Sequence, residues 1–200
     1  MKQSLFTMEH ARQLTADTYE LVLSGDTSAI TAPGQFVNIQ LPGKFLRRPI
    51  SICNWTKDAL LLLVRVVGEG THDLVRCVPG TELDMLSGLG NGFDLAKGGA
   101  HPFLLGGGIG IAPLYGLAQR MLEAGIAPTV GLGFRSGGDA FYLEEFGKLG
   151  CRLMVATEDG SLGTKGFVTD LARHVPECGY AYACGPTPML KAVHGLPQLT

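Results

Sequence analysis

The sequence predicts two domains: an antiparallel β-barrel over residues 1–98 and a doubly wound α/β domain with a parallel sheet over residues 99–200. Two observations support this prediction. The first half consists of short apolar stretches separated by proline and glycine turns, which is typical of a small antiparallel barrel or sandwich. In the second half, strand-like apolar runs alternate with helical segments, which is typical of a parallel sheet. The boundary is predicted near Lys97-Gly98-Gly99-Ala100.

About six short strands are expected in the first half. Residues 35–40 alternate strictly between apolar and polar side chains and are bounded by Pro33-Gly34 and Pro42-Gly43, a pattern that favours a half-buried strand. Residues 18–23 alternate in the same way before a Ser-Gly-Asp turn. Further strands are predicted over residues 48–53, 60–67 and 82–86.

The second half contains four apolar runs that are short enough to be buried strands. They are predicted over residues 103–105, 130–134, 152–156 and 180–184. Helical segments separate them and are predicted over residues 113–124, 143–149 and 166–174. This alternation implies parallel strands joined by helices, with ligands bound at the carboxyl ends of the strands.

The composition is that of a folded protein, with 46% apolar residues, 17% charged residues and a net charge of −2. This charge gives no electrostatic reason to expect nucleic acid or an anionic membrane as a partner. No apolar run reaches the ~18 residues of a membrane span, and the first residues lack the apolar region of a secretory signal, so a soluble, cytoplasmic protein is expected. The five cysteines are widely spaced without a C-x-x-C motif, which argues against disulfides and against a metal site within these residues.

A glycine turn links the first strand of the second half to its helix. Gly106, Gly107 and Gly108 follow the strand, and Pro113 fits the first turn of the helix. Glycines without Cβ atoms let a ligand approach the backbone, and a helix N-terminus is a natural seat for a pyrophosphate. We expect a dinucleotide here. A purely structural turn is the alternative, because the spacing of Gly108, Gly110 and Pro113 departs from the usual G-x-G-x-x-G.

Two segments of the first half could hold phosphate. Arg47 and Arg48 head an otherwise apolar strand, where one of the two guanidinium groups could pair with a phosphate, and Ser51 offers a hydroxyl to a ligand ring. A solvated strand end is the alternative interpretation. Gly70 and Thr71 stand at the start of a short predicted helix, whose free N–H groups can also hold a phosphate.

A third segment, Cys184-Gly185-Pro186, ends the last predicted strand. A side chain at the carboxyl edge of a parallel sheet projects into the ligand crevice. The alternative is a core thiol followed by a proline that ends the strand.

Four motifs together resemble those of the ferredoxin reductase-like flavoproteins, in the same order and spacing. They are Arg48-Pro49-Ile50-Ser51, Gly68-Glu69-Gly70-Thr71, the segment from Gly108 to Pro113, and Cys184-Gly185-Pro186. Three segments resemble the electron-transfer subunits of dihydroorotate dehydrogenases more specifically: residues 47–52 and 184–191, which extend two of these motifs, and residues 89–93. The resemblance extends from about Phe6 to Val193.

The resemblance implies a flavoprotein that oxidises NADH. Ser51, near flavin N5, and Cys184, beside the nicotinamide, are the implied catalytic residues. The implied FAD-binding residues are Arg48, Pro49, Ile50, Ser51, Gly68, Gly70 and Thr71. The implied NAD(H)-binding residues are Gly107, Gly108, Gly110, Pro113, Cys184, Gly185 and Pro186. Beyond the second predicted strand of the sheet, Arg135 and Ser136 could contact a 2′-phosphate, whereas Asp139 would repel one, which favours NADH over NADPH.

The resemblance also implies a partner, the FMN-containing catalytic subunit of dihydroorotate dehydrogenase, in a hetero-oligomer that serves pyrimidine biosynthesis. Members of this family carry four further cysteines that bind a [2Fe-2S] cluster, and these ligands are absent from the 200 residues. Two alternatives stay open: a related NAD(P)H-flavin or ferredoxin-type reductase that serves another acceptor, and a nucleotide-sensing module that moves no electrons.

Overall fold

The computed structural model describes residues 1–176 and 178–196. The chain forms two compact units, residues 1–93 and residues 94–200. They divide five residues before the predicted boundary. Residues 94–98 join the second unit because the Tyr182 hydroxyl donates hydrogen bonds to the carbonyls of Asp94 (2.7 Å) and Leu95 (3.3 Å).

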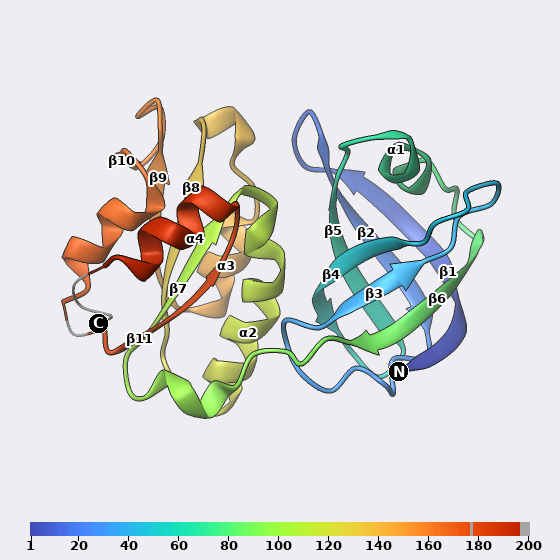
Figure 1. The fold of residues 1–200 in the computed structure, drawn as a ribbon, viewed down its shortest axis with the longest axis horizontal. Helices are drawn as coiled ribbons and strands as arrows, with labels where there is room; N and C mark the ends of the chain where they lie inside the picture. The colour runs from blue at the N-terminus through green and yellow to red at the C-terminus, as the bar shows by residue number, and fades with distance from the viewer. Residues whose placement is uncertain (177, 197–200) are drawn as a thin grey trace. The chain divides into compact units, whose positions relative to one another are not determined.

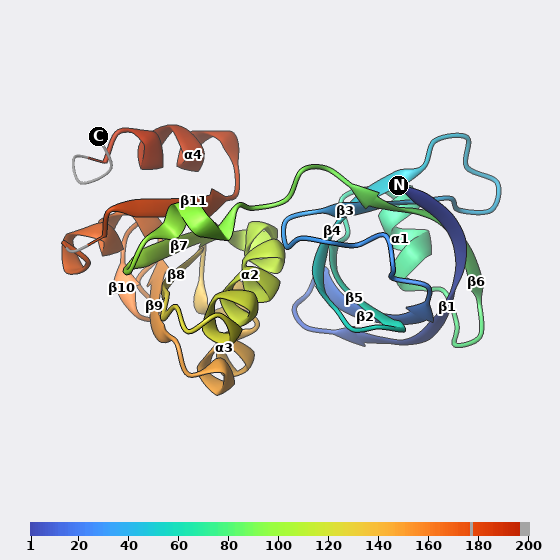
Figure 2. The ribbon, with the colours of Figure 1, turned by 90° about the horizontal axis from the view of Figure 1, so that it is seen from below.

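The first unit is a closed six-stranded antiparallel barrel (Figure 1), which confirms the predicted fold of this half. Its strand order is β1-β2-β5-β4-β3-β6, and Figure 2 looks along the closed ring. One short helix, α1 (Glu69–Val75), separates β5 from β6. The strands are β1 (Lys2–Gln13), β2 (Thr18–Gly25), β3 (Phe36–Ile39), β4 (Arg48–Trp55), β5 (Ala59–Arg65) and β6 (Glu82–Leu89).

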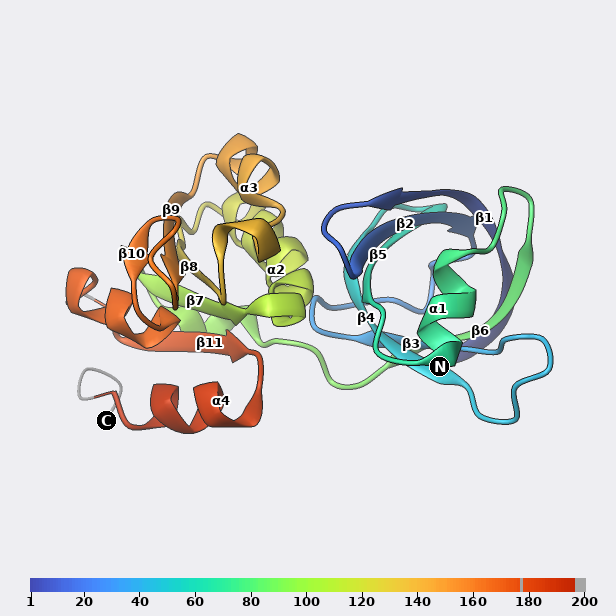
Figure 3. The ribbon, with the colours of Figure 1, turned by 90° about the horizontal axis from the view of Figure 1, so that it is seen from above.

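Alternating side chains fill the barrel. Val37 and Ile39 of β3 are fully buried, as is Ile52 of β4 to within 1% exposure, because every second residue of a strand points to the same face. Helix α1 lies across one end of the barrel (Figure 3) and adds Leu74 and Val75 to the same apolar core. The C-terminal turn of α1 is thereby anchored in the barrel core, and Gly70 in its first turn is buried as well.

The second unit is a five-stranded parallel sheet of order β10-β9-β8-β7-β11, as predicted for a doubly wound domain. The strands are β7 (Pro102–Gly107), β8 (Thr129–Phe134), β9 (Arg152–Thr157), β10 (Thr164–Lys165) and β11 (Tyr180–Cys184). The α-helices are α2 (Ala112–Glu123), α3 (Leu143–Leu149) and α4 (Thr187–His194). The 3-10 segments are η1 (Leu95–Gly98), η2 (Gly108–Ile111), η3 (Gly137–Asp139) and η4 (Val168–His174). The predicted helix over residues 166–174 is thus a 3-10 helix.

Helices cover both faces of this sheet. Figure 2 shows α2 and α3 on one face and α4 on the other. Phe103 and Leu105 of β7 pack with Leu171 of η4 and Val193 of α4 in one core. Within the described residues no helix is long and apolar enough to cross a membrane. The same part of the chain contains no group of three His, Cys, Asp or Glu side chains placed to hold a metal ion.

Candidate functional site

Arg48 lies directly against the first turn of α1. Gly70 is buried there, and a Cβ added to it would lie 2.0 Å from the Arg48 Nε. Glycine is therefore required for the guanidinium to reach the helix backbone. The first bond of the helix runs from His72 N–H to the Gly68 carbonyl (3.0 Å), so the N–H groups of the preceding residues belong to the unsatisfied start of the helix. A guanidinium beside a helix start is a chemically suitable site for a phosphate.

The Thr71 side chain has a structural task in this turn. Its hydroxyl accepts hydrogen bonds from the N–H groups of Val67 (3.0 Å) and Gly68 (3.3 Å) and donates one to the Gly68 carbonyl (3.0 Å). The hydroxyl proton is thus already used in capping α1. A contact between Thr71 and phosphate would come from its backbone N–H, and it stays a prediction.

The structure shows that the neighbouring residues Arg47 and Arg48 have different partners, which the sequence alone could not show. Arg47 pairs with the Asp84 carboxylate on β6 (2.7 Å) and donates to the Asn38 carbonyl on β3 (3.3 Å). The Arg47 guanidinium lowers the pKa of the Asp84 carboxyl below its usual value. Arg47 therefore joins the strands, whereas Arg48, which donates to the Leu46 carbonyl, is the one beside α1.

Ser51 and Arg48 point to opposite faces of β4. The register pairs Ile50 with Val37, which faces the core, and Ser51 with Phe36. Ser51 and Pro49 are exposed on the outer face. Three residues of strand span about 10 Å. A ligand that touches both Arg48 and Ser51 must therefore be long and must pass from the α1 end of the strand to its outer face.

Most glycines in the turn of the second unit are needed because a side chain there would clash with other atoms of the protein. A Cβ at Gly106 would lie 2.7 Å from Ile111 Cγ2, and one at Gly110 would lie 2.4 Å from the Cys184 carbonyl oxygen. Gly108 is different. It has a φ of 52°, and no atom of the described residues lies within 4 Å of an added Cβ. Gly108 is therefore where a ligand finds accessible backbone, at the start of η2, which leads into α2.

Cys184 and the glycine turn meet at one edge of the sheet, as the parallel topology predicted. Cys184 of β11 is paired with Gly106 of β7, and its carbonyl packs on Gly110. Burial raises the pKa of the Cys184 thiol above its ordinary value, so the side chain is a neutral thiol at neutral pH. Pro113 is buried in the first turn of α2.

Comparisons with known proteins identify the family. Residues 104–195 match the family model of the oxidoreductase NAD-binding domain. The chain is 43% identical over 201 residues to the "Dihydroorotate dehydrogenase B (NAD(+)), electron transfer subunit" of Shouchella clausii, covering 96% of this chain and 77% of that protein. It is 40% identical to the same subunit of Listeria monocytogenes, covering 96% and 78%. The chain belongs to the dihydroorotate dehydrogenase B electron transfer subunit family.

Solved structures agree with this family. A structure described as an NADH-dependent reduced ferredoxin-NADP oxidoreductase, used in flavin-based electron bifurcation, is 30% identical with a TM-score of 0.83, covering 94% of this chain and 70% of that one. The Amycolatopsis cytochrome P450 reductase GcoB is 25% identical with a TM-score of 0.84, covering 96% and 65%. The predicted oxidoreductase class, the electron-transfer role and the cofactors FAD and NAD(H) are confirmed at the level of the family.

Met189 is a residue of this electron transfer subunit that sequence reasoning left without a role. A Cβ added at Gly107 would lie 2.5 Å from the Met189 Sδ, and a Cβ added at Gly185 would lie 2.6 Å from it. Met189, from the first turn of α4, therefore packs on the last residue of β7 and on the residue that follows β11. Its place in the segment after Pro186 was visible in the sequence, but its contact with Gly107 depends on the parallel pairing of the two strands.

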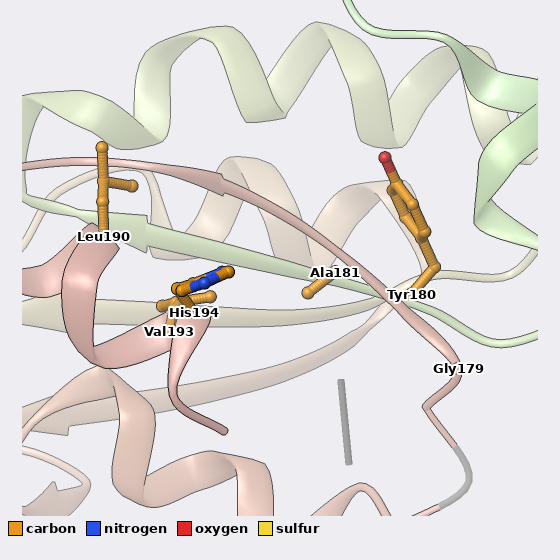
Figure 4. A pocket seen from close by; sticks show the side chains of 6 residues that line it. All are labelled: Gly179, Tyr180, Ala181, Leu190, Val193 and His194. Atoms are coloured by element: carbon orange, nitrogen blue, oxygen red, sulfur yellow. The ribbon is translucent and has the colours of Figure 1, made fainter. Parts of the chain in front are cut away.

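A small cavity lies elsewhere in this unit (Figure 4), between the start of β11 and α4. Its volume is about 290 Å³. It is lined by Gly179, Tyr180, Ala181, Leu190, Val193 and His194. Because the cavity lies at the beginning of β11, it is separate from Cys184 at the strand's end, and none of the predicted site residues lines it.

Proposed function

We propose that this chain binds FAD along β4 and α1 of its barrel, binds NAD(H) at the carboxyl ends of β7 and β11, and passes electrons from NADH to a protein partner. The contact of Arg48 with Gly70 supports this proposal most directly. The buried glycine lets a guanidinium lie beside the N–H groups of a helix start. An anion bound by both groups suits this arrangement.

The residues present fit the two halves of FAD. The pyrophosphate requires positive charge and backbone N–H donors, which Arg48 and the first turn of α1 supply. The ring system requires a flat, accessible face with a hydrogen-bond donor, which exposed Pro49 and Ser51 supply on the outer face of β4. The length that separates these groups along the strand suits a dinucleotide and not a single phosphate.

The second unit fits a nicotinamide dinucleotide. Gly108 leaves open space at the start of η2 and α2, where a pyrophosphate is favoured by the helix start. Cys184 follows at the same edge, on the neighbouring strand. Its neutral thiol adds no charge beside a nicotinamide ring, whose charge changes on oxidation, and we assign it a positioning contact there.

The cofactors supply the redox chemistry: nicotinamide gives a hydride, and flavin accepts two electrons and can release them singly. The chain supplies binding and orientation. Arg48 neutralises phosphate charge, the hydroxyl of Ser51 holds one edge of the ring by a hydrogen bond, and Gly108 lets the pyrophosphate approach the backbone. Orientation of this kind accelerates a reaction by fixing the reacting groups in place.

The partner that we propose is a dihydroorotate dehydrogenase catalytic subunit with FMN, because the relatives at 40–43% identity are named as electron transfer subunits of that enzyme. The proposal therefore places the chain in a cytoplasmic hetero-oligomer for pyrimidine biosynthesis. A reductase that serves another acceptor is the second candidate, which the structural neighbour from ferredoxin-NADP oxidoreductase favours. Co-purification with an FMN-containing dehydrogenase separates the two.

The test is an anaerobic titration of the purified, FAD-loaded chain with NADH, followed by the visible flavin spectrum. We expect the flavin band to bleach at about one NADH per FAD. A band that NADH leaves unchanged contradicts the proposal and favours the nucleotide-sensing alternative.

Arg48→Ala tests the placement of FAD. We expect its Kd for FAD to rise about tenfold or more, since a charge-assisted hydrogen bond is removed, while NADH binds as before. Arg76→Ala, which removes the same charge from the exposed end of α1, is the matched control. Equal losses of FAD and NADH affinity in Arg48→Ala contradict the assignment of this site.

A further inference from the structure

A polar cluster that the proposed flavin and pyrophosphate sites do not use follows the end of β8. It consists of Arg135, Ser136 and Asp139, the last on η3. One carboxylate oxygen of Asp139 accepts a hydrogen bond from the Arg135 guanidinium (3.2 Å), and the other accepts one from the Ser136 hydroxyl (3.0 Å). Asp139 thus engages the two nearby side chains whose chemistry best suits a phosphate.

The position of this cluster relative to the glycine turn is defined by the sheet. Strands β7 and β8 are adjacent and parallel, with Gly107 opposite Gly133. Arg135 is two residues beyond Gly133. In dinucleotide-binding α/β sheets, the group after the second strand meets the adenosine ribose: an acid favours the 2′-hydroxyl of NAD, and an arginine accommodates the 2′-phosphate of NADP. This cluster contains both an acid, Asp139, and an arginine, Arg135, and the two form an ion pair with each other.

The neighbouring loop after β9 adds negative charge and holds the cluster in place. Asp159 N–H donates to the Arg135 carbonyl (3.2 Å), and Gly137 N–H donates to the Ser161 hydroxyl (2.7 Å). The Ser161 hydroxyl in turn donates to the Asp159 carboxylate (2.7 Å). This bond lowers the pKa of Asp159, so Asp159 is charged at neutral pH. The Asp139 carboxylate is therefore paired with the Arg135 guanidinium, and a second, charged carboxylate lies in the loop that is hydrogen-bonded to the Arg135 backbone.

We infer that Asp139 makes the chain selective for NAD(H) over NADP(H), because it occupies Arg135 and Ser136 and repels a 2′-phosphate. The arginine and the serine are a latent 2′-phosphate site that the aspartate closes. This inference rests on the proposed NAD(H) site. It adds the residue that discriminates between the two nicotinamide cofactors and the physical means by which it does so.

The experiment measures binding of two adenosine fragments to the purified full chain by calorimetry, since it then needs no flavin turnover. The fragments are 5′-ADP and 2′,5′-ADP, which carries the additional 2′-phosphate. We expect the wild-type chain to prefer 5′-ADP. Asp139→Asn removes the charge and keeps the size, and we expect its affinity for 2′,5′-ADP to rise about tenfold or more, with 5′-ADP changed by less than about twofold.

Two control variants and one replacement variant sharpen the result. Arg135→Ala combined with Asp139→Asn is expected to lose the gain, because the freed guanidinium is the group that binds the phosphate. Glu144→Gln removes the same charge from another acid–base pair of this unit, Glu144 with Lys148 (3.5 Å), and is expected to gain nothing. Asp139→Ser replaces Asp139→Asn if the latter does not fold, as judged by circular dichroism.

The outcomes separate the inference from the proposed function. A folded Asp139 variant that binds 5′-ADP without any gain for 2′,5′-ADP overturns the inference and leaves the NAD(H) site intact. A gain of equal size in Glu144→Gln also overturns it, because the effect is then general charge. A wild-type chain that binds neither fragment nor NADH contradicts the NAD(H) site itself.

Discussion

Single glycines decide what can approach the backbone in both units. Gly70 makes room for a guanidinium and Gly110 for a carbonyl, whereas a Cβ at Gly108 would meet no atom of the described residues within 4 Å. All three are equally visible in the sequence as glycine, and only the surroundings show that they serve different purposes. The role of each of these glycines is therefore defined by the atom, if any, that a Cβ at that position would displace.

The contact at Gly70 leads to a prediction about FAD. In Gly70→Ala, the new Cβ would lie 2.0 Å from the Arg48 Nε, so the guanidinium must leave the helix start. We expect the Kd for FAD to rise about tenfold or more, measured by flavin fluorescence. Gly147→Ala, where an added Cβ meets nothing within 4 Å, is the control, and normal FAD affinity in Gly70→Ala contradicts the expected role of the contact.

The Cys184 thiol leads to a prediction about pH. Burial raises its pKa, and only the thiolate reacts with iodoacetamide. We expect Cys184 to be alkylated more slowly than free cysteine at pH 8 and its reaction to accelerate only at higher pH. Peptide mass mapping measures this, and bound NADH should slow the reaction further. Fast alkylation at neutral pH would show a thiolate instead of a neutral thiol.

At the scale of elements, one side chain of α4, Met189, contacts the carboxyl ends of both β7 and β11. Met189 packs on Gly107, the last residue of β7, and on Gly185, which follows β11, whereas Gly110 meets the Cys184 carbonyl. The first contact is with the end of a flexible side chain and the second is with backbone. The clash of an alanine at Gly107 should therefore be relieved by a second substitution at Met189, whereas the clash of an alanine at Gly110 should not.

A double-substitution experiment tests this difference. We expect Gly107→Ala to lower thermal stability and NADH affinity, because its Cβ would lie 2.5 Å from the Met189 Sδ. Met189→Ala should relieve most of that loss when the two are combined. It should not relieve Gly110→Ala, whose Cβ would lie 2.4 Å from a carbonyl oxygen. Equal relief of both variants, measured by thermal unfolding and NADH titration, is the result that opposes this account.

At the scale of the whole molecule, most of the architecture could be predicted from the sequence because strands, turns and helices have local patterns. The alternating residues 35–40 and the run into Gly106 are examples. Strand β1 could not be predicted, since most of its twelve residues are polar and exposed, and only Phe6 and Met8 are buried. Its strand state depends on pairing with β2 and β6, which a local pattern does not reveal.

The candidate site shows the same limit. The motif residues could be predicted from their order along the chain, but their contacts could not. Arg47 and Arg48 are identical in type and adjacent, and their different roles depend on Asp84 and Gly70, which lie far along the sequence. The domain boundary also depends on a distant contact, the hydroxyl of Tyr182 on the Asp94 carbonyl.

The strand order of the two sheets affects solubility through their edges. An exposed sheet edge is a template for aggregation, because its N–H and C=O groups can pair with another chain. The barrel is closed and has no edge. The parallel sheet ends on one side in β10, which is two residues long, and on the other in β11, which is five. Within the described residues, β11 therefore offers the longest free sheet edge to a second chain, and crowding or heat should promote association there first.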